Sequence, residues 1–274
     1  MIYSLAFPAF DPVLVALGPF QIRWYALAYI ASLVAGWQIV VRLVRLDPHV
    51  ATKEQVDDFL TWATLGVVLG GRLGYVLFYQ PSHYLTHPLD AIAVWQGGMS
   101  FHGGALGVIV ATLLFTRKHG INPLGFGDRV ATVVPIGLFL GRCANFINGE
   151  LWGREAPADL PWAMGFPNAP GGILLLRHPS QLYEAALEGL VLLTIMAVCC
   201  SRHSIRARFG MLCGIFLTGY GVARIIGEHF REPDAFLGFL AGGITMGQVL
   251  SLPMILLGLV LIVRARSQPA YRIA

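Results

Sequence analysis

The chain has 274 residues, of which 56% are hydrophobic and 12% are charged, with a formal net charge of +4 at pH 7. Soluble domains carry about 25% charged residues, so this composition excludes an ordinary soluble fold and indicates a polytopic membrane protein. The positive charge is small and dispersed, which argues against nucleic acid as a partner. The four cysteines form no CxxC pair and lie in or beside apolar runs, so we interpret them as packing residues.

Residues 1–19 precede the first long apolar run. They include Asp11 but no basic residue, because the first basic residue is Arg23. A secretory signal peptide opens with a basic segment, so this pattern predicts that the first apolar run is retained as a membrane span. We expect residues 1–19 to lie along the outer surface of the membrane as an arm.

Seven apolar runs are each long enough to cross a bilayer, which takes about 20 residues in a helix. Glycines recur within them, as in membrane helices that pack closely, and no internal repeat is present. We therefore expect an all-α polytopic membrane protein with seven transmembrane helices in a single integral-membrane domain. The runs lie near residues 21–42, 59–79, 98–116, 129–148, 181–200, 209–228 and 244–263 of the 1–274 chain.

The distribution of lysine and arginine predicts the orientation. The loop of residues 80–97 has no basic residue, whereas 12 of the 19 basic residues lie in the connections on the other side. By the positive-inside rule those connections are cytoplasmic, so the N-terminus is outside and the C-terminus is cytoplasmic. The Pro- and Gly-rich segment 150–180 is then a small periplasmic cap. The 12 residues are Arg42, Arg45, Lys53, Arg117, Lys118, Arg129, Arg202, Arg206, Arg208, Arg264, Arg266 and Arg272.

The other seven basic residues are all arginines at the outer side of the spans, or inside a span near its outer end. An arginine within a membrane segment is costly and usually faces the bundle interior with a partner. Its planar guanidinium suits bidentate binding of phosphate or carboxylate. The seven are Arg23, Arg72, Arg142, Arg154, Arg177, Arg224 and Arg231.

The stretch FLGRCANFINGELWGRE ends the fourth span. On a helix, Arg142, Asn145 and Gly149 share one face, and Glu150 and Trp152 follow at the membrane boundary. An interfacial anchor would explain Trp152 through the aromatic belt. It does not explain Arg142, which lies within the apolar run. This stretch therefore predicts a polar pocket.

The sixth span carries a second polar face. Tyr220, Arg224, Glu228 and Arg231 follow at i, i+4, i+8 and i+11, so they share a narrow stripe. Glu228 can pair with both arginines, which lowers the cost of burying them. A structural ladder of ion pairs is one interpretation. The stripe has two positive charges and one negative charge, so we expect an excess of positive charge that attracts an anion.

His102, in MSFHGGALG, lies at the outer end of the third span and precedes two glycines. A hydrogen-bonded packing histidine and a general base are both open interpretations, since histidine transfers protons near neutral pH. His83 and His87 are spaced like metal ligands on one helical turn, but no third ligand is evident. We expect no metal site.

These polar residues converge on the outer half of the membrane, the depth of a phospholipid headgroup. Chemistry on a lipid phosphate there needs a cationic clamp, a base and lateral access for the lipid. The converging residues are Tyr25, Arg72, His102, Arg142, Asn145, Glu150, Arg224, Glu228 and Arg231.

Seven stretches, in order along most of the chain, resemble those of the bacterial prolipoprotein diacylglyceryl transferases: FQIRWYALAY, GGRLGYVLFY, GGMSFHGGALG, GRCANFINGELWGR, HPSQLYEA, GYGVARIIGEHFREPD and GITMGQVLS. The resemblance implies an inner-membrane enzyme with its active site toward the periplasm. It would transfer the diacylglyceryl group of phosphatidylglycerol to the lipobox cysteine of preprolipoproteins, forming a thioether and releasing glycerol phosphate. The family uses no metal or nucleotide cofactor.

The resemblance also implies roles for residues. Negative charge grows on the departing phosphate, so arginines aimed at it favour the transition state. Arg142 and Arg231 are the first choices for phosphate contact, His102 is the candidate base, and Glu228 holds Arg224. The other expected substrate-binding residues are Tyr25, Arg72, Asn145, Glu150, Gly153 and Tyr220.

Three other functions compete with this interpretation. An anion or lipid transporter could use the same arginine-lined cavity, but the polar residues cluster at one depth only. An intramembrane protease needs a Ser–His pair or paired aspartates within spans, and aspartate is absent from the span interiors. A membrane scaffold would not need a cationic face with a histidine.

Overall fold

The computed structural model describes residues 5–8, 10–18, 20–233, 238–269 and 271, which form two compact units. The first unit comprises the described residues of Met1–Ile39 and Asp128–Ala274, and the second comprises Val40–Gly127. The divisions between the units fall after Ile39 and after Gly127, so the chain passes from one to the other twice.

The second unit is built on two helices that pack along each other, α2 (Lys53–Phe78) and α4 (Phe101–His119). Their seam is made of glycines: a Cβ on Gly66 would lie 2.7 Å from the carbonyl oxygen of Gly107, and one on Gly70 would lie 2.8 Å from its Cα. No larger residue fits at that distance, so the glycines let the two backbones meet as small residues do in membrane helices. The loop between the helices contains α3 (Pro81–Thr86), η1 (Pro88–Ile92) and η2 (Val94–Gln96).

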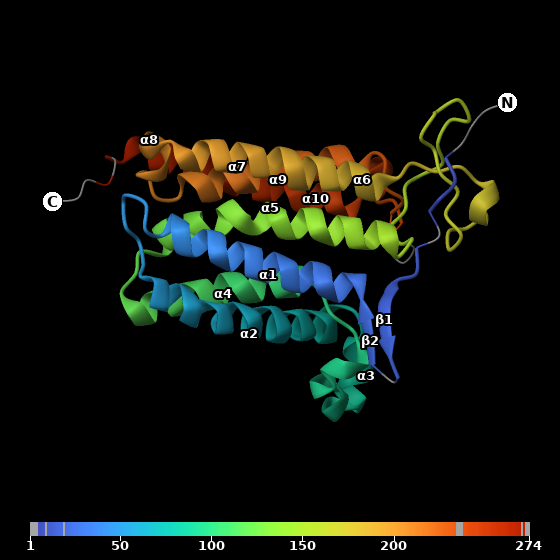
Figure 1. The fold of residues 1–274 in the computed structure, drawn as a ribbon, viewed down its shortest axis with the longest axis horizontal. Helices are drawn as coiled ribbons and strands as arrows, with labels where there is room; N and C mark the ends of the chain where they lie inside the picture. Colours follow the sequence, from blue (N-terminus) through green and yellow to red (C-terminus); the bar gives the residue numbers. More distant parts are fainter. Residues whose placement is uncertain (1–4, 9, 19, 234–237, 270, 272–274) are drawn as a thin grey trace. The chain divides into compact units, whose positions relative to one another are not determined.

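The first unit holds the remaining elements, apart from residues 40–43 of α1 and 123–127 of α5, and its helices α9 and α10 lie side by side along their length (Figure 1). Buried Asp128 accepts hydrogen bonds from the backbone N–H groups of Gly210 and Cys213, at 2.8 and 2.7 Å, and so caps the start of α9. The elements are β1 (Val13–Leu17), β2 (Phe20–Arg23), α1 (Trp24–Leu43), α5 (Pro123–Ile147), η3 (Gly172–Leu174), α6 (Ser180–Glu184), η4 (Ala185–Val191), α7 (Leu192–Ser201), α8 (His203–Arg206), α9 (Met211–Glu228), η5 (Ala241–Gly243) and α10 (Met246–Ser267).

Six helices among the described residues are long and apolar enough to cross a membrane. They are α1, α2, α5, the continuous helix Ser180–Ser201, α9 and α10. Only 11% of the most apolar stretch of α10 is buried, which suits a surface that faces lipid tails. The expected polytopic, mostly helical membrane protein is therefore confirmed. The run expected at 98–116 does form a helix, α4, but it is not among the six.

Beside the helices, the structure contains a short hairpin that the sequence interpretation did not include. Residues Val13–Leu17 and Phe20–Arg23 form an antiparallel hairpin, so the first helix begins at Trp24 instead of residue 21. Gly18 in the turn has a φ of +60°, which glycine adopts without strain. The expected arm of residues 1–19 thus includes a strand, and residues 1–4, 9 and 19 lie outside the described part of the chain.

The segment expected as a cap, residues 150–180, packs on a small apolar core of its own. Phe146, Met164 and Phe166 are buried there, and Phe7 packs on both phenylalanine rings, with centroids 5.4 and 5.1 Å away. Isolated β-bridges tie Met164 to Arg177 and to Leu5. The cap is therefore an ordered layer at the ends of α5, α6 and α9.

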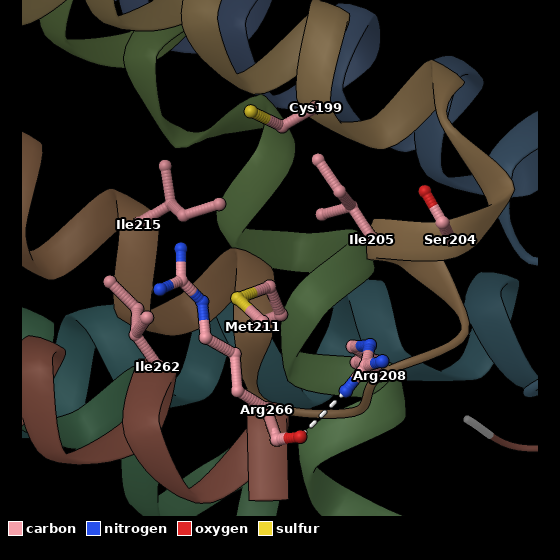
Figure 2. A pocket seen from close by; sticks show the side chains of 8 residues that line it. All are labelled: Cys199, Ser204, Ile205, Arg208, Met211, Ile215, Ile262 and Arg266. Carbon is pink, nitrogen blue, oxygen red and sulfur yellow. Dashed lines mark hydrogen bonds between the residues drawn. The ribbon is translucent and has the colours of Figure 1, made fainter. Parts of the chain in front are cut away.

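A cavity of about 540 Å³ lies at the other end of the same unit (Figure 2). Apolar side chains from the end of α7, from α9 and from the last turns of α10 line it, together with two arginines. Ser204 and Ile205 of α8 complete the lining, which consists of Cys199, Ser204, Ile205, Arg208, Met211, Ile215, Ile262 and Arg266.

Candidate active site

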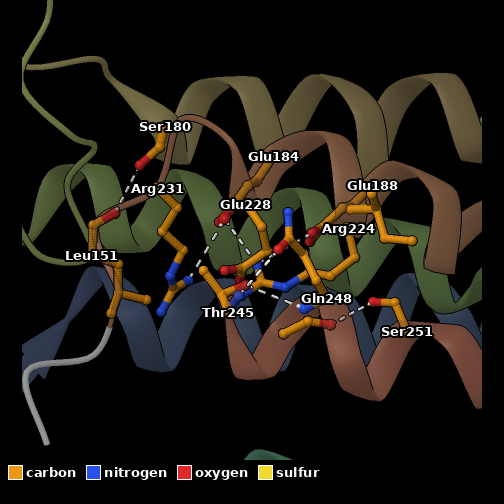
Figure 3. Close-up of polar contacts among 12 residues, drawn as sticks. Leu151, Ser180, Glu184, Glu188, Arg224, Glu228, Arg231, Thr245, Gln248 and Ser251 are labelled. Atoms are coloured by element: carbon orange, nitrogen blue, oxygen red, sulfur yellow. Dashed lines mark hydrogen bonds and ion pairs between the residues drawn. The ribbon is translucent and has the colours of Figure 1, made fainter. Parts of the chain in front are cut away.

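Six charged side chains of the first unit form a buried group, called here the ionic cluster. Figure 3 shows Glu184, Glu188, Arg224, Glu228 and Arg231 with their charged ends turned toward one another. Arg142 on α5 completes the group through its ion pairs with Glu184 and Glu188. The cluster thus joins α5, α6, η4 and α9 with the residues that follow α9.

The two central glutamates are fully buried, at 0% exposure; Glu184 meets three arginines and Glu188 meets two. Arg142 places Nη1 3.0 Å from Glu184 Oε2, and its Nη2 lies 3.0 Å from Glu188 Oε2. Arg224 places Nη1 2.8 Å from Glu184 Oε1 and 3.5 Å from Glu188 Oε1. It also pairs through Nη2 with Glu228, one helical turn later. Arg231 Nη1 lies 3.6 Å from Glu184 Oε1.

The expected excess of positive charge in this group is wrong. The cluster has three arginines and three glutamates, so its formal charges balance. Glu184 and Glu188 were missing from the sequence interpretation, although they lie four residues apart within the run 181–200. An ionisable residue inside a span is a functional candidate by default, so this spacing was the signal that could have found them.

The glutamates belong to a helix with altered geometry. Glu184 ends α6, and Glu188 lies in η4, a π-helix that spans Ala185–Val191. A π-turn holds more residues than the 3.6 of an α-turn, and such turns are frequent at functional sites. The helix is therefore wider over Ala185–Val191, where the two buried carboxylates face the arginines of α5 and α9.

The turn after α5 forms a second polar group beside the start of α6. Asn145 donates from Nδ2 to Glu150 Oε1 at 2.7 Å, and Asn148 donates to the same oxygen at 3.4 Å. Gln181, fully buried, donates from Nε2 to the backbone oxygen of Glu150 at 2.7 Å. Its Oε1 is buried and has no hydrogen-bond partner among the described residues. An unsatisfied buried acceptor is costly, so this oxygen is suited to a ligand hydroxyl or a water.

Gly153 links the cap to the ionic cluster. Its N–H donates to the backbone oxygen of His178 at 3.0 Å, and it forms a β-bridge with Arg231. A Cβ at this position would collide with the backbone oxygen of His178 and would lie 2.6 Å from that of Phe230. Gly153 is therefore needed because only a glycine fits between the backbones of His178 and Phe230. This close packing fixes the position of Arg231, which follows Phe230.

Arg154, the next residue, fastens the end of α9. Its Nη2 donates to the backbone oxygen of Glu228 at 2.8 Å, and its Nε donates to that of Arg231 at 3.0 Å. A cation at a helix C-terminus satisfies the last carbonyls and is favoured by the helix dipole. Its guanidinium also lies over the ring of Phe239, 4.9 Å from the centroid. These contacts give Arg154 a structural role at the end of α9.

Arg72, in the second unit, is surrounded by backbone carbonyls. It is 5% exposed, and its guanidinium donates to Ala91 at 2.8 Å, Asp90 at 2.5 Å, Gly97 at 2.5 Å and Gly98 at 3.2 Å. Four acceptors use most of its five N–H donors. The geometry thus supports a role in holding the loop after α2.

The structure leaves the remaining expected residues in different settings. His102 is the second residue of α4 and is exposed in the second unit, with its ring 5.8 Å from that of Phe101. Tyr25 is exposed at the start of α1. Tyr220 is buried one turn before Arg224, and its ring stacks on Phe216. Contacts within one unit therefore bring together Arg142, Arg224, Glu228, Arg231 and Gly153, with Asn145 and Glu150 paired nearby. In the described part of the chain, no three His, Cys, Asp or Glu side chains could hold a metal ion.

Comparison with known proteins gives the chain its family. A family model described as prolipoprotein diacylglyceryl transferase matches residues 12–264. The chain is similar to three curated proteins that carry the name phosphatidylglycerol–prolipoprotein diacylglyceryl transferase. One, from Gluconacetobacter diazotrophicus, is 64% identical over 270 residues, which cover 98% of this chain and 95% of that protein. The protein from Acidiphilium cryptum is 60% identical over 259 residues, which cover 94% of this chain and 93% of that protein. The protein from Rhodospirillum centenum is 58% identical over 266 residues, which cover 97% of this chain and 95% of that protein. This chain belongs to the prolipoprotein diacylglyceryl transferase family.

Proposed function

We propose that this protein transfers the diacylglyceryl group of phosphatidylglycerol to the lipobox cysteine of preprolipoproteins. The family match over residues 12–264 is the observation that carries this conclusion. Six apolar helices and a buried group of arginines and glutamates agree with a reaction on a charged lipid in the membrane. The protein is an enzyme that forms a thioether.

The reaction exchanges one bond for another at the lipid glycerol. The cysteine sulfur, as a thiolate, bonds to the glycerol carbon that carries the phosphate, and the bond between this carbon and the phosphate oxygen breaks. The electron pair leaves with that oxygen, so glycerol phosphate departs with added negative charge. The thiol proton passes to a base, which is a modest task for a group with an ordinary pKa near 8.5. Stabilising the departing phosphate is therefore the larger demand on the protein.

We assign that task to donors of the ionic cluster. A guanidinium has five N–H donors, and the contacts of Arg142 with Glu184 and Glu188 occupy three nitrogen positions. Two N–H groups of Arg142 are then left for phosphate oxygens. The buried glutamates hold the guanidinium in place before the lipid arrives, which is what preorganised stabilisation requires. The N–H groups of Arg142 and Arg231 bind the phosphate of the headgroup, and Arg224 helps to hold the glutamates that orient these two arginines. The cluster as a whole is neutral.

The other proposed roles follow from the chemistry of the side chains and from the family resemblance. His102 takes the thiol proton, and Tyr25 holds the headgroup or the peptide. Asn145, Glu150 and Gln181 bind the glycerol hydroxyls of the headgroup, because they combine carboxylate and amide oxygens with one unsatisfied buried acceptor. Gly153, Tyr220 and Glu228 support the site through packing and through the contacts described above, whereas Arg72 holds the loop after α2 in the second unit.

The membrane arrangement completes the proposal. Helix α4 has 19 residues, about 28 Å at 1.5 Å per residue, which is close to the thickness of the bilayer core. It is the third span in chain order and brings the number of spans of a single membrane domain to seven, with the N-terminus outside and the C-terminus cytoplasmic. The protein lies in the bacterial inner membrane, and the ionic cluster and cap of residues 150–180 face the periplasm. Single cysteines at residues 87 and 204 test this, because only the first should react with an impermeant maleimide in intact spheroplasts.

The test of the function is a mass measurement. Purified protein in phosphatidylglycerol vesicles should convert a lipobox peptide to a product heavier by one diacylglyceryl group, with release of glycerol phosphate. Arg142→Gln should reduce this conversion by at least about 100-fold, the scale seen when one charge-stabilising group is removed. Arg264→Gln, on the exposed last turn of α10, is the matched control. A normal rate for Arg142→Gln, or intact phosphatidylglycerol with the wild type, would refute the assignment.

A further inference from the structure

The cavity between α7, α9 and α10 is separate from the reaction site. It begins at Met211, the first residue of α9, whereas Arg224 and Glu228 of the ionic cluster occupy the last turns of the same helix. At 1.5 Å per residue these positions are roughly 20 Å apart along the helix axis. Its volume of about 540 Å³ is within the range of small-molecule sites.

The cavity has an apolar body and a cationic edge. Ile215 and Ile262 form its wall, and Met211 lies at its centre (Figure 2). In the same view the side chain of Arg266 extends from α10 toward Ile215, and the guanidinium of Arg208 lies beside the backbone oxygen of Arg266. A phospholipid has the same division, with apolar chains below a charged phosphate.

Arg208 is held by hydrogen bonds, and neither arginine of the lining is neutralised by a carboxylate among the described residues. Arg208 donates from Nη1 to the backbone oxygen of Arg266 at 2.8 Å, at the C-terminal end of α10. Its Nε and Nη2, and the guanidinium of Arg266, contact no acceptor within the described residues. Residues 189–227 and 235–274, which contain the whole lining, have no aspartate or glutamate. Asp128, at the same end of α9, accepts backbone hydrogen bonds and is buried.

We propose that this cavity binds an anionic phospholipid, with Arg208 and Arg266 on its phosphate and the apolar wall along its acyl chains. Basic pockets between membrane helices are suited to such headgroups, and each arginine near a charged membrane surface contributes about 1 kcal/mol. The site lies at the ends of α7, α9 and α10, where headgroups of the nearby leaflet are found. In the proposed orientation this is the cytoplasmic leaflet, the opposite one from the reaction.

The probe for the test is phosphatidic acid with a diazirine in one acyl chain. This lipid is anionic and lacks the glycerol headgroup of the substrate. After photolysis of the purified protein in detergent, mass spectrometry should find the label on peptides that contain Ile205, Ile215 or Ile262. Arg266→Gln should lower labelling there about fivefold, since about 1 kcal/mol corresponds to that factor. The double variant with Arg208→Gln should lower it further.

Arg264→Gln is the matched control, since Arg264 is exposed on the same turn of α10 and does not line the cavity. The Arg264→Gln variant should be labelled like the wild type. Arg266→Gln should keep normal lipobox transfer, so the labelling experiment tests the cavity and the transfer assay tests the proposed function independently. Equal labelling by a phosphatidylcholine probe with the same chains would overturn recognition of the headgroup charge. Displacement of the probe by inorganic phosphate at millimolar concentration would show a site for the free ion, and would overturn the lipid.

Discussion

Arg142 on α5 reaches the carboxylate of Glu188 in η4 with two nitrogens, Nε at 3.2 Å and Nη2 at 3.0 Å from the same oxygen. The two residues are 46 positions apart in the chain. Burying such a pair is favourable only when its geometry is good and its remaining donors have partners. Here a second glutamate and a second arginine complete the arrangement, so each charge is balanced by the others. The cluster therefore behaves as one unit, and changes to it should not be additive.

Glu188→Gln should destabilise the protein by about 3 kcal/mol or more, because it leaves two buried arginines with one carboxylate fewer. Transfer should fall at least tenfold, since Arg142 loses the partner that orients it. Thermal unfolding in detergent and the lipobox assay measure the two effects. Glu155→Gln, on an exposed residue of the cap, should change neither.

The double variant Arg142→Gln with Glu188→Gln should cost less stability than the sum of the single variants, by roughly 1–3 kcal/mol. Additive losses would contradict a direct ion pair.

Gly153→Ala should disturb the joint between the cap and α9. The added methyl group would meet the backbone oxygens of His178 and Phe230, which cannot move as a flexible side chain would. We expect a lower melting temperature and faster proteolysis of residues 150–180, with transfer reduced because Arg231 is displaced. Gly141→Ala is the matched control: a methyl group on this helical glycine would have no neighbouring heavy atom within 4 Å, so the substitution should be neutral or slightly stabilising. Normal stability of Gly153→Ala would contradict the packing role.

Arg72→Lys separates the geometry of the guanidinium from its charge. A lysine ammonium has three donors on a flexible stem and cannot reach all the carbonyls of residues 90, 91, 97 and 98. Hydrogen exchange of residues 88–98 should therefore accelerate although the positive charge is kept. Arg117→Lys, in the last turn of α4, serves as the control and should leave exchange of the loop unchanged. Unaltered exchange in Arg72→Lys would mean that these hydrogen bonds do not hold the loop.

Much of the helical framework could be predicted from the sequence. A run of about 20 apolar residues has few alternatives to a membrane helix, so α2, α5, α9 and α10 fall close to their expected positions. The hairpin before α1 was missed because its strands are apolar and merge with the first run. Whether a short apolar segment pairs as a strand depends on a turn, here at Gly18, and not on hydropathy.

The arginines of the site could be predicted from the sequence, but the net charge of the site could not. The arginines of α5 and α9 stand out in apolar runs, and the sequence identified them. Their partners, Glu184 and Glu188, lie on a different helix, and only tertiary contacts reveal which side chains meet. The hydrogen bonds of Arg72 go to backbone carbonyls, which carry no sequence signal at all. Counting charges on one helix at a time therefore gave an excess of positive charge that the fold cancels.

His178 makes the stability of the cap sensitive to pH. Burial lowers the pKa of this imidazole below its ordinary value of 6.5. Its Nδ1 lies 3.2 Å from the hydroxyl of Tyr183, and its ring meets Phe230 edge to face, with centroids 5.3 Å apart. This setting favours the neutral ring. Below pH 6.5 the unfolded chain then binds more protons than the folded chain, so stability is full above 6.5 and falls as pH decreases through the lower folded pKa.

We therefore expect the melting temperature to decrease between pH 7.5 and pH 5, and His178→Gln to flatten part of this decrease. Glutamine keeps a polar side chain of similar reach but does not titrate in this range. His203→Gln is the control, since His203 is exposed at the start of α8 and should leave the pH profile unchanged. The measurement is a series of thermal scans at constant ionic strength, with hydrogen exchange of residues 150–180 to locate the effect. If the melting temperature of His178→Gln follows that of the wild type at every pH, the protonation that destabilises the protein occurs at another residue. The neutral imidazole of His178 would then not be what stabilises the cap.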